Sequence, residues 1–158
     1  MPAETQYLDS NVLLAYVLGE ANRATTVEQL LREAEGGKRR LITSTISVVE
    51  VAFAAEKSKG FAIDPGALAA IDKLWEGGQP VGLAEASTRT MYVARDLARR
   101  ARSESWGLTP ADAIHLATAV RHEASVLYTY EAKATRERWS SIMGISVDEP
   151  TISQLPLL

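Results

Sequence analysis

The chain has 158 residues, of which 46% are hydrophobic and 23% charged, and its formal net charge is −3. This length and composition are typical of one globular domain with one core. The chain has no cysteine, which excludes disulfide bonds, thiolate zinc sites and a cysteine nucleophile, and its small negative charge gives no support for general nucleic-acid binding.

The first half of the chain alternates short apolar runs with helical patterns. Serine is a favoured helix N-cap, and glycine often ends a helix. On these signals we expect a strand over Thr5–Leu8, a helix over Asn11–Leu18 capped by Ser10, a helix over Ala24–Glu35, a strand over Arg40–Thr43, and a helix capped by Ser47 that runs to about Lys59.

The second half continues the same alternation. Proline suits the first turn of a helix, so Pro65 and Pro110 mark helix starts. We expect a helix from Asp64-Pro65 to Gly77-Gly78, a strand over Pro80–Leu83, a helix over Ser87–Ser105, a helix from Thr109-Pro110, a strand over Ser125–Thr129, a helix over Ala132–Ile142, and a strand over Ile145–Val147.

Strands that alternate with helices through short connections are typical of a parallel sheet with helices on both faces. The sequence therefore predicts a single three-layer α/β/α domain over residues 1–158, with a mostly parallel central sheet of about five strands. We expect the tail after about residue 149 to be loosely packed.

No apolar run is long enough to cross a membrane. The longest is Val12–Leu18, whereas a spanning helix needs about 20 residues. Glu4 and Asp9 precede this run and no basic residue does, so it does not resemble a secretory signal peptide. We expect a soluble cytoplasmic protein with no membrane partner.

Four acids fall at the ends of predicted strands or in the first turns of predicted helices: Asp9, Glu50, Asp112 and Glu131. Ligands of open α/β sheets bind outside the carboxyl ends of the strands, where these side chains could meet. Two carboxylates about 6 Å apart repel by roughly 3 kcal/mol at an effective dielectric near 20. A hard divalent cation is the simplest reason to gather them, so the pattern predicts a metal-dependent enzyme that acts on phosphate.

Each acid also has an ordinary structural interpretation. Asp9 can cap the following helix, although Ser10 could do this alone. Ser47 and Glu50 fit a capping box, in which the glutamate bonds back to the backbone of the cap residue. An exposed surface position would account for Glu131. For Glu50 the pattern favours neither interpretation.

Asp112 has a similar ambiguity. Thr109 and Asp112 also fit a capping box, and an acid in a first turn suits the helix dipole. The two roles are compatible, because a helix N-terminus can hold a carboxylate while it binds metal. His115 follows Asp112 by about one turn and could bind a metal or hold one of its ligands, although such a histidine is more often a packed residue with one satisfied nitrogen. His122 lies near a helix end, where a cation suits the dipole.

Several other chemistries lack their motifs. The chain has no Walker-type phosphate loop, no GxGxxG after a strand and no GxSxG nucleophile elbow. A phosphatase with a nucleophilic aspartate after the first strand is disfavoured, because Asn11 stands where a second acid is needed.

Four segments, in this order, resemble motifs of the PIN-domain family of metal-dependent ribonucleases, specifically the VapC-type toxins of prokaryotic toxin–antitoxin pairs. They are LDSNVLLAY, STISVVEVAFA, LTPADAIHLATAV and LYTYEAKA, and they extend over nearly the whole chain. The resemblance implies a PIN-like fold and an endoribonuclease that hydrolyses RNA phosphodiester bonds with Mg²⁺ or Mn²⁺. The alternative is a non-catalytic RNA- or protein-binding module that keeps the fold.

The resemblance also implies roles for single residues. Asp9 and Asp112 would be the principal metal ligands, and Glu50 would complete the site directly or through water. Glu131 stands where the family usually has aspartate. The positions that would orient ligands, water or substrate are Ser10, Asn11 and Thr129.

Partners follow from the same resemblance. It implies an RNA substrate, an antitoxin protein that blocks the site, and a homodimer. We expect RNA phosphates to contact the helix face that carries Arg95, Arg99 and Arg102, because these residues are spaced at about one helical turn.

Overall fold

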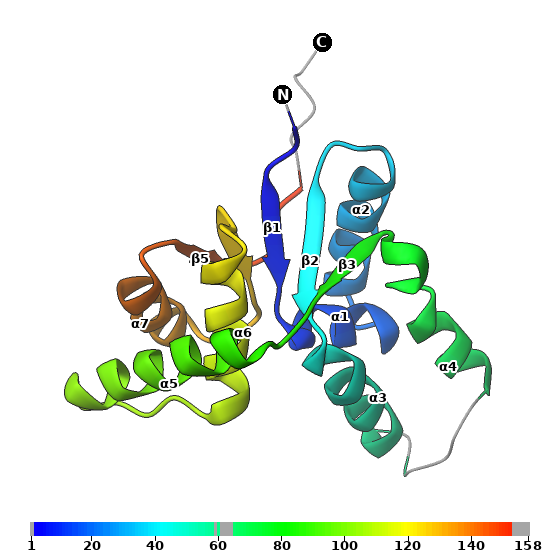
Figure 1. Cartoon of the computed structure of the whole chain (residues 1–158). Coiled ribbons are helices and arrows are strands. Elements are labelled where there is room, and N and C mark those ends of the chain that lie inside the picture. Colours follow the sequence, from blue (N-terminus) through cyan, green and yellow to red (C-terminus); the bar gives the residue numbers. More distant parts are fainter. Residues whose placement is uncertain (1, 59, 61–64, 153–158) are drawn as a thin grey trace.

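A central parallel sheet with helices on both faces forms the body of the protein (Figure 1). The computed structural model describes residues 2–58, 60 and 65–152. In these residues the strand order is β3-β2-β1-β4-β5, and every neighbouring pair is parallel. The predicted α/β/α architecture is confirmed.

The strands are short, and they alternate with helices along the chain. They are β1 (Thr5–Leu8), β2 (Arg40–Ser44), β3 (Val81–Ala84), β4 (Val126–Tyr128) and β5 (Ser146–Asp148). The helices are α1 (Ser10–Val17), α2 (Arg23–Glu35), α3 (Ile46–Ser58), α4 (Pro65–Asp72), α5 (Thr88–Ser103), α6 (Pro110–Arg121) and α7 (Lys133–Met143), with a short 3₁₀ helix η1 (Glu76–Gly78).

The strand order reverses at β1. The chain adds β2 and then β3 on one side of β1, and later adds β4 and β5 on the other side. Tyr7 of β1 is paired with Ile42 on one side and with Leu127 on the other. The chain leaves β1 toward β2 and leaves β4 toward β5, on opposite sides of the β1–β4 pair. A crevice therefore forms at the carboxyl ends of β1 and β4, which is where open α/β sheets bind ligands.

Consecutive residues of β1 pack into different cores, because side chains alternate across a strand. Leu8 joins a core formed with α1 to α4, which includes Val12, Leu30 and Trp75. Tyr7 joins a core formed with α5 to α7, which includes Leu116. Both β1 side chains are fully buried. Burial on both faces is typical of a parallel strand.

Most predicted boundaries agree with the structure to within one or two residues. The predicted helix up to Gly77-Gly78 is an exception, because α4 ends at Asp72 and a turn and η1 follow. Gly77 and Gly78 have φ values of 70° and 77°, a conformation that ends a helix and that glycine adopts readily. The expected boundaries at Lys59 and Asp64 lie outside the described residues.

The tail expected to be loosely packed begins at about residue 149. Within it, the Thr151 hydroxyl and the Tyr128 hydroxyl form a hydrogen bond at 3.3 Å. Residues 153–158 are not among the described residues. Among the helices described, none combines the length and apolar character that a membrane crossing requires.

Candidate active site

Asp9 lies at the carboxyl end of β1, at the point where the strand order reverses. Its backbone N–H donates to the carbonyl of Tyr128 at 3.0 Å, which extends the β1–β4 pairing by one residue. Its Oδ1 accepts the Ser10 N–H at 2.8 Å, and its Oδ2 accepts the Thr129 hydroxyl at 2.8 Å. The side chain is 6% exposed. Asp9, and not the predicted Ser10, is therefore the cap of α1.

Thr129 joins α1 to the loop after β4. Its buried Oγ1 accepts the Asn11 side-chain amide at 3.0 Å and the Glu131 N–H at 3.2 Å. The Asn11 carbonyl oxygen accepts the Tyr130 N–H at 3.1 Å. Asn11 and Thr129 thus hold Asp9 and the Glu131 loop in fixed positions, and whether they also contact a substrate stays a prediction.

Glu50 is bound to a buried histidine. The His115 Nε2 lies 2.5 Å from Glu50 Oε1, and its Nδ1 lies 2.5 Å from the Tyr7 hydroxyl. The Tyr7 hydroxyl also accepts the Ser44 N–H at 3.0 Å. The same Nε2 lies 3.7 Å from Asp9 Oδ1. The fully buried ring therefore links Glu50 to the Asp9 side of the site.

The predicted capping box at Ser47 and Glu50 is wrong. Helix α3 already begins at Ile46, so Ser47 lies inside it. The fully buried Ser47 hydroxyl lies 2.7 Å from Thr43 Oγ1, which itself donates to the Leu8 carbonyl at 2.7 Å. Because Ser47 packs against β2 and does not cap α3, the Glu50 side chain is left to bond with His115.

Of the two hydrogen bonds of a capping box at Thr109 and Asp112, the structure contains one. Thr109 caps α6 and its hydroxyl accepts the Asp112 N–H at 3.2 Å. In the described part of the chain, the Asp112 carboxylate makes no hydrogen bond or ion pair in return. The carboxylate is held at the helix start by its backbone and keeps both oxygens available for a ligand.

Burial and neighbouring charges shift the pKa values of Asp9, Glu131 and His115. Burial, followed by the charge of Asp112, raises the pKa of Asp9, against the opposing effects of His115 and Thr129. Burial and the charges of Asp9 and Asp112 raise the pKa of Glu131. Burial lowers the pKa of His115, but the hydrogen bond to Glu50 and the charges of Asp9, Glu50 and Asp112 outweigh it and raise the pKa.

The chemistry of these side chains fits a hard divalent cation. They offer carboxylate oxygens, which Mg²⁺ and Mn²⁺ prefer, and a cation would relieve the repulsion between their negative charges. Within residues 2–58, 60 and 65–152, however, no three His, Asp or Glu side chains already stand together in a metal-holding arrangement. The donor set is present, whereas the ligand geometry is not preformed.

The predicted arginine line lies on the exposed side of α5. Arg95 pairs with Asp96 at 3.1 Å and its guanidinium lies 5.0 Å from the centre of the Tyr92 ring. In the described residues, no hydrogen bond or ion pair joins Arg95, Arg99 or Arg102 to the four acids. The structure does not bring these arginines into the acidic site, and contact with RNA beyond it stays a prediction.

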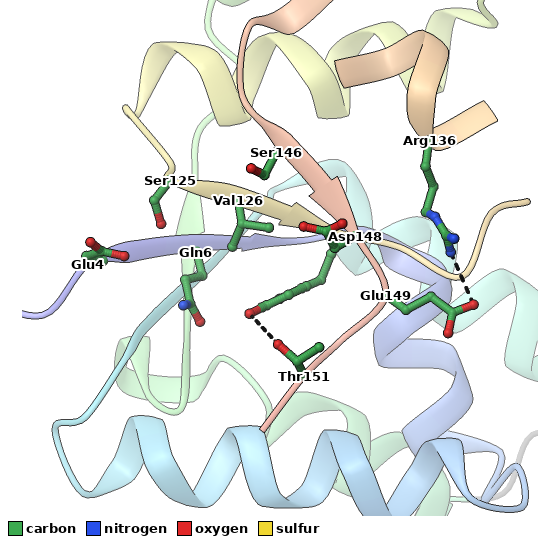
Figure 2. Close-up of a pocket in the computed structure, with 10 residues that line it drawn as sticks. Glu4, Gln6, Ser125, Val126, Arg136, Ser146, Asp148, Glu149 and Thr151 are labelled. Carbon is green, nitrogen blue, oxygen red and sulfur yellow. Dashed lines mark hydrogen bonds and ion pairs between the residues drawn. The ribbon is translucent and has the colours of Figure 1, made fainter. Parts of the chain in front are cut away.

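Pockets lie beside the acids and along the β1, β4 and β5 side of the sheet. A pocket of 270 Å³ adjoins the acids and is lined by Ser10, Asn11, Leu14, Glu50, Val51, Phe53 and Ala54. Figure 2 shows a second, larger pocket of 470 Å³ along β1, β4 and β5, in which the Tyr128 hydroxyl meets Thr151 and Arg136 pairs with Glu149 at 3.2 Å. None of the four acids is among its described lining residues.

Sequence reasoning did not identify Tyr7 or Ser44 as parts of the site. Both lie in strands that read only as buried and apolar, and nothing local marks a tyrosine hydroxyl that will face a histidine. The one available signal was His115, one helical turn after Asp112. Its ring is packed as expected, but both ring nitrogens have a partner, where one was expected.

Comparison with known proteins gives a family match. A family model described as PIN domain matches residues 6–137, a stretch that includes all four acids. No curated protein sequence matches the chain.

Solved structures with the same fold cover most of the chain. VapBC2 from Rickettsia felis, bound to a promoter DNA fragment, has a TM-score of 0.68 at 14% identity, over 92% of this chain and 98% of that chain. FitAcB from Neisseria gonorrhoeae has a TM-score of 0.62 at 16% identity, over 92% and 97%. Mycobacterium tuberculosis VapC20, described as a Sarcin-Ricin loop cleaving toxin, has a TM-score of 0.61 at 13% identity, over 82% and 92%. At these identities the likeness is one of fold.

Proposed function

The chain belongs to the PIN-domain family, and we propose that it is a metal-dependent endoribonuclease that serves as the toxin of a type II toxin–antitoxin pair. The observation that carries this proposal is the buried Asp9, whose pKa is raised by burial and by the charge of Asp112. A protein that keeps a carboxylate in such a position gains from a bound cation there. Structural likeness to a VapC toxin described as cleaving RNA supports the substrate class.

The ion would be Mg²⁺ or Mn²⁺, held by Asp9 and Asp112, with Glu50 contributing directly or through water. When bound, such an ion lowers the pKa of a water molecule and neutralises charge on the phosphate. Burial and the charges of Asp9 and Asp112 raise the pKa of Glu131, so its carboxylate faces the same charged site and would bind the ion through water or not at all.

The neighbouring residues would keep the principal ligand in place. Each Asp9 oxygen accepts one hydrogen bond, from Ser10 N–H and from the Thr129 hydroxyl. A carboxylate oxygen has two lone-pair directions, so each still has one to offer a cation. Asn11 acts indirectly, because it fixes Thr129 and the Tyr130 backbone.

Partners would be an RNA, an antitoxin protein and a second copy of the chain, all met in the cytoplasm. Complexes with VapBC and FitAB names among the structural neighbours support the antitoxin. We place RNA phosphates against Arg95, Arg99 and Arg102, which are exposed on α5, because phosphate contacts are made mainly by exposed basic side chains.

Cleavage of total cellular RNA tests the proposal. Purified protein is incubated with Mg²⁺, Mn²⁺ or EDTA, beside Asp9→Asn and a matched control, Asp72→Asn, at the exposed end of α4. We expect discrete products that require the metal and Asp9 and that Asp72→Asn still forms. Metal-independent products, or full activity in Asp9→Asn, would contradict the proposal.

A non-catalytic RNA- or protein-binding module is the alternative. It is supported by Glu131, which stands where the PIN family usually has aspartate, and by the fact that no three-ligand group is preformed in the described residues. Such a module would bind its partner equally well in EDTA, and Asp9→Asn would leave that binding unchanged.

A further inference from the structure

We propose that His115 is a positioning residue, which holds the Glu50 carboxylate at the acidic site through Nε2 while Tyr7 fixes its ring through Nδ1. The inference rests on the proposed function, because it assigns to Glu50 a part in metal binding. It adds a residue that neither the acid pattern nor the family match assigns to the site.

A continuous line of hydrogen bonds leads from the backbone of β2 to Glu50. The Ser44 N–H donates to the Tyr7 hydroxyl at 3.0 Å, and this hydroxyl lies 2.5 Å from His115 Nδ1. On the other side of the ring, Nε2 lies 2.5 Å from Glu50 Oε1. The four residues come from β2, β1, α6 and α3, so the line joins four separate elements of the fold.

The positions of the protons follow from the donors available. An ionised carboxylate can only accept a hydrogen bond, so Nε2 carries the proton that Glu50 accepts. In the neutral ring Nδ1 is then the acceptor, and the Tyr7 hydroxyl, which itself accepts the Ser44 N–H, donates to it. If the ring is fully protonated, Nε2 still carries a proton. Glu50 therefore meets a donor at Nε2 in either state.

Tyr7 and His115 are buried and fixed, whereas the Glu50 side chain that they hold is partly exposed. Tyr7 and His115 are fully buried, and their rings meet edge to face with centroids 5.8 Å apart. The Glu50 side chain is 35% exposed, so without its partner it could turn to solvent. His115 holds Glu50 Oε1. Glu50 Oε2 makes no hydrogen bond in the described residues, and its position is set by that of Oε1.

Among the described residues, only His115 bonds the Glu50 carboxylate. Val49 and Phe53 of α3 are 71% and 58% exposed and have apolar side chains. Ser10 and Asn11, which line a pocket with Glu50, make no hydrogen bond to it. Carboxylates that bind metals are usually held by a further hydrogen bond, and loss of that bond typically weakens metal affinity or activity about 10- to 100-fold. His115 is the residue in a position to supply it.

Mn²⁺ binding measured by calorimetric titration, without RNA, tests this role. The variants are His115→Leu, which removes the donor, His115→Gln, which keeps an amide N–H in its place, and Tyr7→Phe, which frees the ring. We expect the dissociation constant for Mn²⁺ to rise about 10- to 100-fold in His115→Leu, with substantial recovery in His115→Gln and an intermediate value in Tyr7→Phe. His122→Leu, at the exposed C-cap of the same helix, is the matched control and should bind as wild type.

The same titration in a Glu50→Gln background separates positioning from general loosening of the core. If His115 acts through Glu50, His115→Leu adds no further loss of Mn²⁺ affinity there, because interacting residues are not additive. Equal losses in both backgrounds would overturn the proposal, as would unchanged Mn²⁺ affinity in a folded His115→Leu or, should that variant not fold, in Tyr7→Phe. Failure of the wild type to bind Mn²⁺ would instead contradict the proposed function itself.

Discussion

The Asp9 carboxylate and the Thr129 hydroxyl, 120 positions apart in the chain, meet at 2.8 Å across the carboxyl ends of β1 and β4. Thr129 is fully buried, and the same oxygen accepts from Asn11 and from the Glu131 backbone. This single hydroxyl therefore orients the principal carboxylate, the start of α1 and the loop that carries Glu131.

Replacing Thr129 by valine keeps the shape of the side chain and removes the hydroxyl. We expect Thr129→Val to lower the free energy of unfolding by about 1–3 kcal/mol, because it leaves buried polar groups without a partner. Urea unfolding provides the measurement. Thr25→Val, at an exposed position of α2, is the control and should stay within about 0.5 kcal/mol of wild type. Equal stability of the two variants would show that the hydroxyl has no such role.

A divalent cation should stabilise the folded protein through Asp9. Any ligand that binds only the folded state raises the unfolding temperature, so Mn²⁺ should raise that of the wild type in a concentration-dependent way. Asp9→Asn should abolish the shift without unfolding the metal-free protein, since asparagine is as good a helix cap as aspartate. Differential scanning fluorimetry with and without EDTA measures both. A full Mn²⁺ shift in Asp9→Asn would remove Asp9 from the ligand set.

In the metal-free protein, the titration of Asp9 should make the free energy of unfolding depend on pH. Its ordinary pKa is 3.8, and burial with the charge of Asp112 raises the pKa in the folded state. A raised folded pKa means that the folded state binds the proton more tightly, so this contribution is fully present below pH 3.8 and is lost as the pH rises through the folded pKa. Glu131, with an ordinary pKa of 4.5, shifts in the same direction.

Urea unfolding in EDTA at a series of pH values makes this measurable. The free energy of unfolding of the wild type minus that of Asp9→Asn should decrease as the pH rises from below 3.8 toward neutrality, since only the wild type carries the titrating group. A difference that increases over the same interval would mean that the folded state favours the charged carboxylate, contrary to its burial.

Removal of the arginine line on α5 should weaken RNA binding and its dependence on salt. For single strands, each phosphate contact contributes a slope of about −0.7 in the logarithm of affinity against the logarithm of salt concentration, so Arg95→Ala/Arg99→Ala/Arg102→Ala should reduce the magnitude of the slope by roughly 2. Fluorescence anisotropy with a labelled RNA, in the Asp9→Asn background to prevent cleavage, provides the values. Arg32→Ala, exposed on α2, is the control, and an unchanged slope in the triple variant would refute this surface.

The elements of the fold could be predicted because their signals are local. Apolar runs, proline at helix starts and glycine at helix ends are read within a few residues, and most boundaries agree closely with the structure. Asp9 and Asp112 could be singled out for the same reason, since each follows directly from a strand end or a helix start. The cap of α1 was assigned to Ser10 because either neighbour could serve, and only the observed hydrogen bond to Asp9 decides.

The Ser47 prediction failed because burial of a helix start depends on what packs against it. Ser47 fits a cap by spacing alone, yet α3 docks on β2 so that this hydroxyl meets Thr43 inside the protein. Once Ser47 is inside the helix, Glu50 has no cap to bond and is directed to α6.

The sequence by itself determined the order of strands and helices and the placement of Asp9 and Asp112 at one edge of the sheet, because periodicity and capping act over a few residues. Only the tertiary structure decided the partners of Glu50. Tyr7 is 108 positions from His115, and His115 is 65 positions from Glu50. Their hydrogen bonds require β1, α6 and α3 to be packed around the sheet at particular distances and orientations, and those are properties of the folded core that no local pattern encodes.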